Sequence, residues 1–90
     1  MKRVVITVIG ADRVGIIAAV TQVLAEKHIN VLSINQTILD GFFNMILIGD
    51  MTDASTDMQS LQTELAGLGE KMGLEIRAQL ADLFYSMHRI

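Results

Sequence analysis

The spacing of hydrophobic positions changes along the chain, and each spacing predicts a different element. Residues 3–9 are almost all hydrophobic and β-branched, which predicts a buried central strand. Over residues 14–27 hydrophobic side chains recur at the three- and four-residue intervals of an amphipathic helix. The same spacing returns over residues 57–72, whereas residues 74–80 alternate between hydrophobic and polar side chains, as a strand with one solvated face does.

A hairpin is predicted in the middle of the chain. Asp40-Gly41 separates two β-rich runs, residues 31–39 and 42–51, and this dipeptide favours a two-residue turn because both turn positions need a positive φ. Such a turn fixes the cross-strand register. The predicted pairs are Ile34 with Leu47, Gln36 with Met45 and Ile38 with Phe43 on one face, and Ser33 with Ile48, Asn35 with Ile46 and Thr37 with Asn44 on the other. The first face is expected to belong to the core, and the second is mixed.

Residue types near the helix ends predict how the helices begin and end. Thr56 and Gln59 have the spacing of a capping box at the start of the second helix. Gly67 and Gly69 lie inside that helix, where each costs about 1 kcal/mol relative to alanine, so its last turns are expected to be weak. His28 follows the first helix, where the helix dipole favours its cation as a capping group.

The order of these elements predicts an α+β, ferredoxin-like βαββαβ sandwich, with a four-stranded antiparallel sheet and two helices on one face. The other face of the sheet is then uncovered and mixed in polarity. The tail, residues 81–90, is expected to form a short helix that covers this face in its own or a second subunit. Because 90 residues suffice for one domain, residues 1–90 are interpreted as a single domain.

Composition and charge narrow the classes of partner. With 51% hydrophobic residues, a chain this short has more apolar surface than a small core hides, which predicts a homodimer. The net charge of −3 and the scattered basic residues argue against nucleic acid. No hydrophobic run approaches the roughly 18–20 residues that span a bilayer, so no membrane partner is expected. The absence of cysteine fits a cytoplasmic protein, and the pattern of His, Asp and Glu predicts no metal site, cofactor or catalytic residue.

The sequence GADRVGI, residues 10–16, lies between the first strand and the first helix. Gly10 ends the strand, Asp12 is near the expected N-cap, and Gly15 is in the first turn. The start of a helix has unpaired N–H groups and partial positive charge, which suit a carboxylate, while Asp12 suits an ammonium. The loop therefore offers groups for both ends of a free amino acid. The alternative is that Asp12 only caps the helix and the glycines only make the turn.

GADRVGI resembles the G-x-D-x-x-G-I/L signature of ACT domains at the same strand-to-helix position. The resemblance to small stand-alone ACT proteins of bacteria and archaea continues through NQTILDGFFNMILI (residues 35–48) and GLEIRAQ (residues 73–79) and ends in MHRI (residues 87–90). ACT domains are regulatory modules that bind amino acids or other small ligands at a subunit interface, through this loop and the start of the second strand. The ligand-binding residues that the resemblance implies are Gly10, Asp12, Arg13, Gly15, Ile16 and Asn30.

The sequence therefore predicts a non-catalytic, amino-acid-sensing regulatory domain. It is expected to act as a homodimer whose second subunit closes the ligand pocket. Ligand binding is expected to change the arrangement of the dimer or of a separate protein partner. One alternative is a dimerisation or protein-interaction module whose loop binds no small molecule. A second is an acylphosphatase-like hydrolase of the same fold, in which Arg13 and either Asn30 or Asn35 would hold phosphate and a water molecule.

Overall fold

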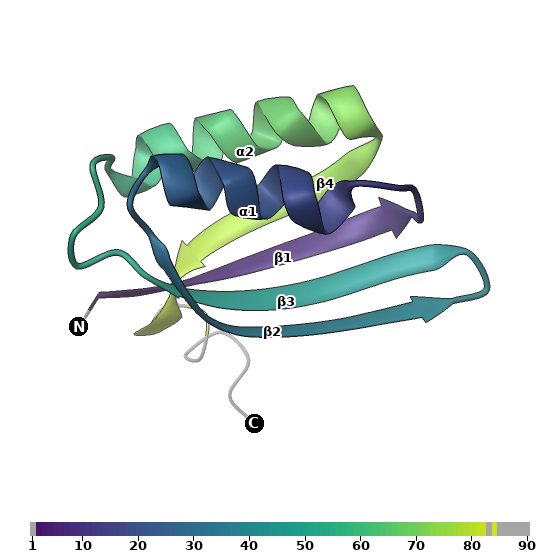
Figure 1. Ribbon diagram of the computed structural model, residues 1–90, viewed down its shortest axis with the longest axis horizontal. Helices are drawn as coiled ribbons and strands as arrows, with labels where there is room; N and C mark the ends of the chain where they lie inside the picture. Colours follow the sequence, from purple (N-terminus) through teal and green to yellow (C-terminus); the bar gives the residue numbers. More distant parts are fainter. Residues whose placement is uncertain (1, 83, 85–90) are drawn as a thin grey trace.

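The computed structural model describes residues 2–82 and residue 84 (Figure 1). Its elements are β1 (Arg3–Ala11), α1 (Ile16–Glu26), β2 (Asn30–Leu39), β3 (Phe42–Asp50), α2 (Met58–Met72) and β4 (Leu74–Leu80). The strands form one antiparallel sheet in the order β2-β3-β1-β4, and both helices lie on the same side of it (Figure 1). The predicted ferredoxin-like fold is confirmed. Within the described residues, neither helix is long and apolar enough to cross a membrane.

The hairpin between β2 and β3 forms in the predicted register. Asp40 and Gly41 have φ values of 54° and 79°, as the two-residue turn requires. Every cross-strand pair predicted from the Asp-Gly turn is present. The only departure from regular β2–β3 pairing in the described strands is a shift between Val31 and Ser33, typical of a β-bulge. A local turn signal was therefore sufficient to predict the register along most of both strands.

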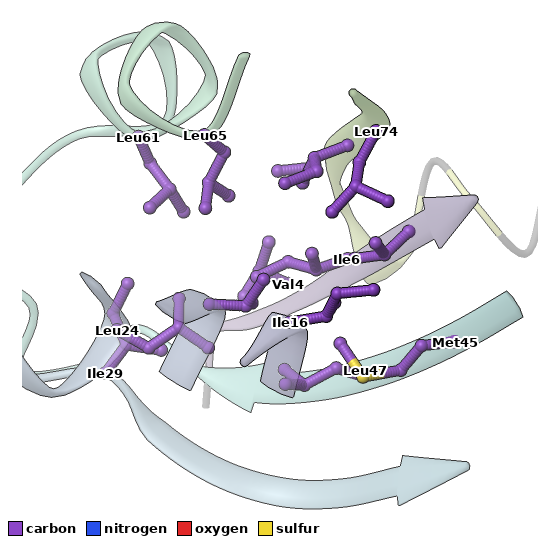
Figure 2. Close-up of a cluster of buried hydrophobic side chains, with 14 of the residues drawn as sticks. Val4, Ile6, Ile16, Leu24, Ile29, Met45, Leu47, Leu61, Leu65 and Leu74 are labelled. Atoms are coloured by element: carbon purple, nitrogen blue, oxygen red, sulfur yellow. The ribbon is translucent and has the colours of Figure 1, made fainter. Parts of the chain in front are cut away.

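The core lies between the helices and the helix-facing side of the sheet (Figure 2). In β1, Val4, Ile6 and Val8 have no exposed surface, which agrees with the prediction of a buried central strand. The helices contribute buried side chains to the same cluster, namely Ile16, Val20 and Leu24 from α1 and Leu61 and Leu65 from α2. β1 is thus enclosed between two neighbouring strands and the helices.

β2 is an edge strand that the helices leave uncovered, and in Figure 1 it lies farthest from α2. The predicted core face of the hairpin is therefore buried on β3 alone. Phe43, Met45 and Leu47 are buried, whereas their partners Ile38, Gln36 and Ile34 are exposed. The expectation that the β2 positions also belong to the core is wrong, because these positions of the outer strand remain exposed to solvent. Of the residues of β2, Val31 alone is half-buried and the others are exposed.

α1 begins at Ile16, later than the predicted residue 14, because Gly15 takes a left-handed conformation with a φ of 91°. Gly15 itself is the N-cap residue, and no side chain caps the helix. The interpretation of Asp12 as the capping residue is therefore wrong. β1 also runs on to Ala11, past its predicted end at residue 9, so that Asp12 directly follows the strand.

Asp57, and not the predicted Thr56–Gln59 pair, caps α2. Its carboxylate accepts a hydrogen bond from the backbone N–H of Ser60 at 2.7 Å. The prediction therefore placed the N-cap one residue too early, because the extended backbone of Asp57 already places its carboxylate over the first turn. The hydrogen bond from Ser60 lowers the pKa of the Asp57 carboxyl below its ordinary value of 3.8.

The Asp57 cap predicts a pH-dependent contribution to stability. Because the folded pKa is depressed, the stabilisation is present above the unfolded pKa and is lost as the pH falls through the folded value. Asp57→Ala is therefore expected to lower the melting temperature at neutral pH, by an amount that shrinks below about pH 4. Thermal unfolding at a series of pH values measures this difference. Asp53→Ala, at another exposed aspartate, is the matched control. If the difference in melting temperature between the wild type and Asp57→Ala did not depend on pH, Asp57 would not be the capping residue of α2.

The described residues after β4, which are 81, 82 and 84, lie on the side of the sheet away from the helices (Figure 1). Ala81, Asp82 and Phe84 are helical, and Ala81 is buried. The rest of the helix predicted over residues 81–90 lies outside the described residues.

Candidate functional site

The loop segment, residues 10–16, lies at the end of the sheet where three connections meet (Figure 1). The backbone N–H of Asp12 donates to the carbonyl of Gly41, at the tip of the β2–β3 hairpin, at 2.9 Å. The guanidinium of Arg13 donates to the carbonyl of Met72, at the end of α2, at 3.4 Å. The loop segment is therefore tied to the hairpin on one side and to the α2–β4 junction on the other.

Neither of these two contacts was predicted from the sequence. The signal that could have found the first is topological, since an antiparallel β3 next to β1 places its hairpin tip beside the end of β1. The contact between Arg13 and Met72 depends on how far α2 extends over the sheet, which no local pattern indicates.

The two glycines of the loop segment, Gly10 and Gly15, serve different structural purposes. A Cβ on Gly10 would lie 2.7 Å from Cδ2 of Leu74 and 3.0 Å from the carbonyl oxygen of Gly73, so this glycine allows β1 to pack against the start of β4. Gly15 has open space around it, with no atom within 4 Å of an added Cβ, and its positive φ makes the turn into α1. The space beside the start of α1 is therefore accessible.

Exposed polar groups surround the start of α1. The first helical hydrogen bond joins the N–H of Ala19 to the carbonyl of Gly15, so the preceding N–H groups lack helical partners. Asp12 and Arg13 are exposed. Ile16 is only 2% exposed and its side chain lies in the core (Figure 2), so the accessible part of the site comes from the residues that precede it. The site is a small patch of amide donors flanked by one acidic and one basic side chain.

The structure places Asn30 far from the loop segment of the same chain. The sheet register pairs both Arg3 and Asn30 with Asp50, so Asn30 is level with the beginning of β1. Gly10 lies at the other end of β1, on the order of 20 Å away along the strand. β1 and β2 are both antiparallel to β3 and therefore run in the same direction, which places the start of β2 opposite the loop end. Asn30 and Asp12 can approach one ligand only across two copies of the chain.

The pairing that an acylphosphatase would need does not form within the chain. Asn30 is at the far end of the sheet, and Asn35 is level with Thr7 through its pairing with Ile46. Arg13 follows the end of β1 and points to the α2–β4 junction instead. Among the residues that the structure describes, no group of three or more His, Asp or Glu side chains is arranged to hold a metal ion.

Comparison with known proteins decides the family. A family model of the ACT domain matches residues 2–79. The chain belongs to the ACT domain family. This ACT domain is 47% identical to a UPF0237 protein of Methanocaldococcus jannaschii, over the full length of both chains. The resemblance stated from the GADRVGI sequence is therefore confirmed.

Solved structures resemble this ACT domain closely. An ACT domain protein from Streptococcus pneumoniae is 34% identical, with a TM-score of 0.81 over 92% of this chain and 93% of the other. The ligand-free regulatory subunit of aspartate kinase from Thermus thermophilus is 28% identical, with a TM-score of 0.66 over 87% of this chain and 50% of the other. ACT domains are regulatory, generally bind small-molecule ligands and form oligomers.

Proposed function

We propose that this ACT domain is a non-catalytic sensor that binds a free amino acid at the loop segment and acts as a homodimer. The observation that carries the proposal is the exposed turn that leads into α1, at Val14 and Gly15, beside Asp12. The ligand carboxylate accepts hydrogen bonds from the unpaired N–H groups at the start of α1, with Arg13 at its side. The ligand ammonium binds the carboxylate of Asp12, which is not engaged in capping the helix.

The edge strand β2 supports the homodimer. Its sequence, NVLSINQTIL, contains no charged residue and no proline over ten residues. Edge strands of monomeric proteins are usually short or protected by charges, prolines or a covering segment. β2 instead exposes hydrophobic side chains on both of its faces, namely Leu32, Ile34, Ile38 and Leu39. We infer that β2 of a second copy pairs with it and extends the sheet.

Antiparallel pairing of two β2 strands also completes the ligand site. In this arrangement the start of one β2 lies opposite the end of the other. Asn30 of the second copy then lies at the Leu39 end of the first chain, which is the end that carries the loop segment. Asn30 thus contributes to the site across the interface, although it is remote within its own chain. Ligand binding and dimerisation are consequently linked, and each strengthens the other.

Thermal unfolding in the presence of each of the twenty amino acids tests the proposal. A ligand at about 100 times its Kd adds roughly 2.7 kcal/mol of stability, which raises the melting temperature of a domain this small by several degrees. We expect a selective rise with one amino acid or a few related ones. If no amino acid raises the melting temperature of a protein that is nevertheless dimeric, the loop segment belongs to a protein-interaction module.

Asp12→Ala is expected to abolish this ligand-induced rise while leaving the melting temperature without ligand nearly unchanged, because the Asp12 side chain does not cap α1. The matched control is Asp53→Ala, which removes an exposed carboxylate from the β3–α2 connection and should keep the full ligand response. Titration of each variant by calorimetry measures the loss of affinity. If Asp12→Ala binds the amino acid with the same affinity as the wild type, Asp12 is not part of the ligand site.

A further inference from the structure

The outer edge of β2 carries backbone groups whose directions follow from the hairpin. Leu39 and Phe42 flank the two-residue turn, and in such a turn the flanking residues point their N–H and C=O groups at each other. Because this direction alternates along an antiparallel pair, every second residue back from Leu39 also points its backbone groups at β3. The residues between them point theirs away from the sheet. These edge-facing residues are Ile34, Gln36 and Ile38.

The regular part of this edge is short and symmetrical about one residue. The shift between Val31 and Ser33 interrupts the alternation near the start of β2, and the turn ends it after Leu39. Residues 33–39 therefore form the regular segment. Gln36 is its middle residue, and the other two edge-facing residues lie at equal distances on either side.

We propose that Gln36 is the positioning residue of the β2 pair and lies where the two-fold axis crosses the strand. This inference rests on the β2 pairing of the proposed function. Antiparallel strands exchange hydrogen bonds only where edge-facing residues lie opposite each other. The register centred on Gln36 pairs this residue with its own copy and pairs Ile34 with Ile38 of the other chain, so it uses every edge-facing residue. A register displaced along the strand leaves at least one of them without a partner.

The side chains of the edge-facing residues favour the same register. They lie on the helix side of the sheet, because each is paired with a buried core residue of β3. In the centred register Ile34 and Ile38, which are 40% and 55% exposed, cover each other across the interface. The two Gln36 amides meet on the axis, where each supplies a donor and an acceptor. A displaced register places this amide against an isoleucine, where a polar group that loses water without gaining a hydrogen bond is unfavourable.

The register also determines which part of the second copy reaches the ligand site. Beyond Leu39 the first chain turns at Gly41, whose carbonyl accepts a hydrogen bond from the N–H of Asp12. Because the pairing is symmetrical about Gln36, the start of the second β2 extends past Leu39 by the same amount. Asn30 of the second copy therefore lies level with the hairpin turn that is bonded to the loop segment.

Single cysteines test the register directly, because the chain contains no cysteine of its own. Gln36→Cys meets its own copy on the axis, where opposite Cα atoms are about 5.5 Å apart and a disulfide can form. Oxidation is expected to convert this variant to a covalent dimer. Ile34→Cys and Ile38→Cys are each expected to stay monomeric on a denaturing gel when alone, and to link to each other when mixed. Ala66→Cys, on the exposed side of α2, is the matched control and should stay monomeric.

Gln36→Leu separates positioning from a merely structural role. This variant is expected to remain dimeric, but without the amide pair it admits displaced registers. Asn35→Cys does not meet its own copy in the centred register, so it is expected to form a covalent dimer only when Gln36→Leu is also present. Gln36→Asn restores an amide and is expected to keep Asn35→Cys monomeric. If Asn35→Cys stays monomeric with Gln36→Leu as well, the backbone alone sets the register and Gln36 is not the positioning residue.

The failure of this inference is distinguishable from that of the proposed function. If Asn35→Cys or Ile34→Cys alone forms the covalent dimer and Gln36→Cys does not, the axis lies elsewhere and the register is overturned, whereas the β2 dimer stands. If none of the β2 cysteines links more than Ala66→Cys does, the β2 pairing and the register both fail. The ligand-induced rise in melting temperature of the wild type tests the sensor separately.

Discussion

Replacing Gly69 with alanine is expected to destabilise the domain by about 1–3 kcal/mol, the cost typical of overpacking, although alanine is the better helix former. A Cβ on Gly69 would lie 2.6 Å from the carbonyl oxygen of Leu74. This oxygen belongs to the backbone of β4, which cannot move aside as a flexible side chain does. α2 and β4 must therefore separate or distort, and the packing of Leu65 and Ile76 beside them is disturbed.

Gly67→Ala is the matched comparison in the same helix. An added Cβ at Gly67 meets no atom within 4 Å, and the residue is exposed. This substitution is therefore expected to stabilise the domain by up to about 1 kcal/mol, the propensity difference between glycine and alanine. Chemical unfolding of both variants measures the two changes. If both substitutions stabilise the domain, helix propensity dominates at both positions and the close contact at Gly69 is relieved by movement.

Ile34→Lys is expected to halve the mass of the assembly by removing the β2 pairing. Ile34 lies near the centre of the edge strand and is 40% exposed, so in an antiparallel β2 pair the lysines of both copies approach each other near the two-fold axis. The variant loses apolar contact and gains like-charge repulsion, and we expect the association to weaken by at least a factor of about 100, or 2.7 kcal/mol. Ala66→Lys, on the exposed side of α2, is the control for an added surface charge.

The same variant tests whether the β2 pairing completes the ligand site. Ile34→Lys is expected to lose the amino-acid response, because the second copy no longer supplies Asn30 to the ligand site. An Ile34→Lys protein that retains both its mass and its ligand response would exclude β2 as the interface.

Local signals predicted the elements and the hairpin. The Asp40-Gly41 turn fixed the β2–β3 register because a two-residue loop leaves no freedom in which residues pair. The hydrophobic spacing of residues 14–27 indicated α1, but its first residue depended on the left-handed conformation of Gly15. Asp57 and Thr56 are both acceptable capping residues, and the path of the chain into α2 decided between them.

Features that depend on the arrangement of whole elements were not predicted. The exposure of β2 follows from where the helices lie on the sheet, which its own sequence does not indicate. Asn30 was grouped with the loop segment because it begins β2, yet the parallel directions of β1 and β2 place it at the opposite end. The glycines at positions 67 and 69 look alike in sequence, and only the approach of β4 distinguishes them.

The hydrogen bond between Asp12 and Gly41 makes a mechanical connection between two segments that are distant in sequence. The tip of the hairpin is held at the loop segment by this bond, and β2 is the outer strand of the hairpin. A ligand that displaces the loop segment must either break this bond or carry the hairpin tip with it. A displacement of the loop segment that kept this bond would therefore move the outermost strand through the hairpin.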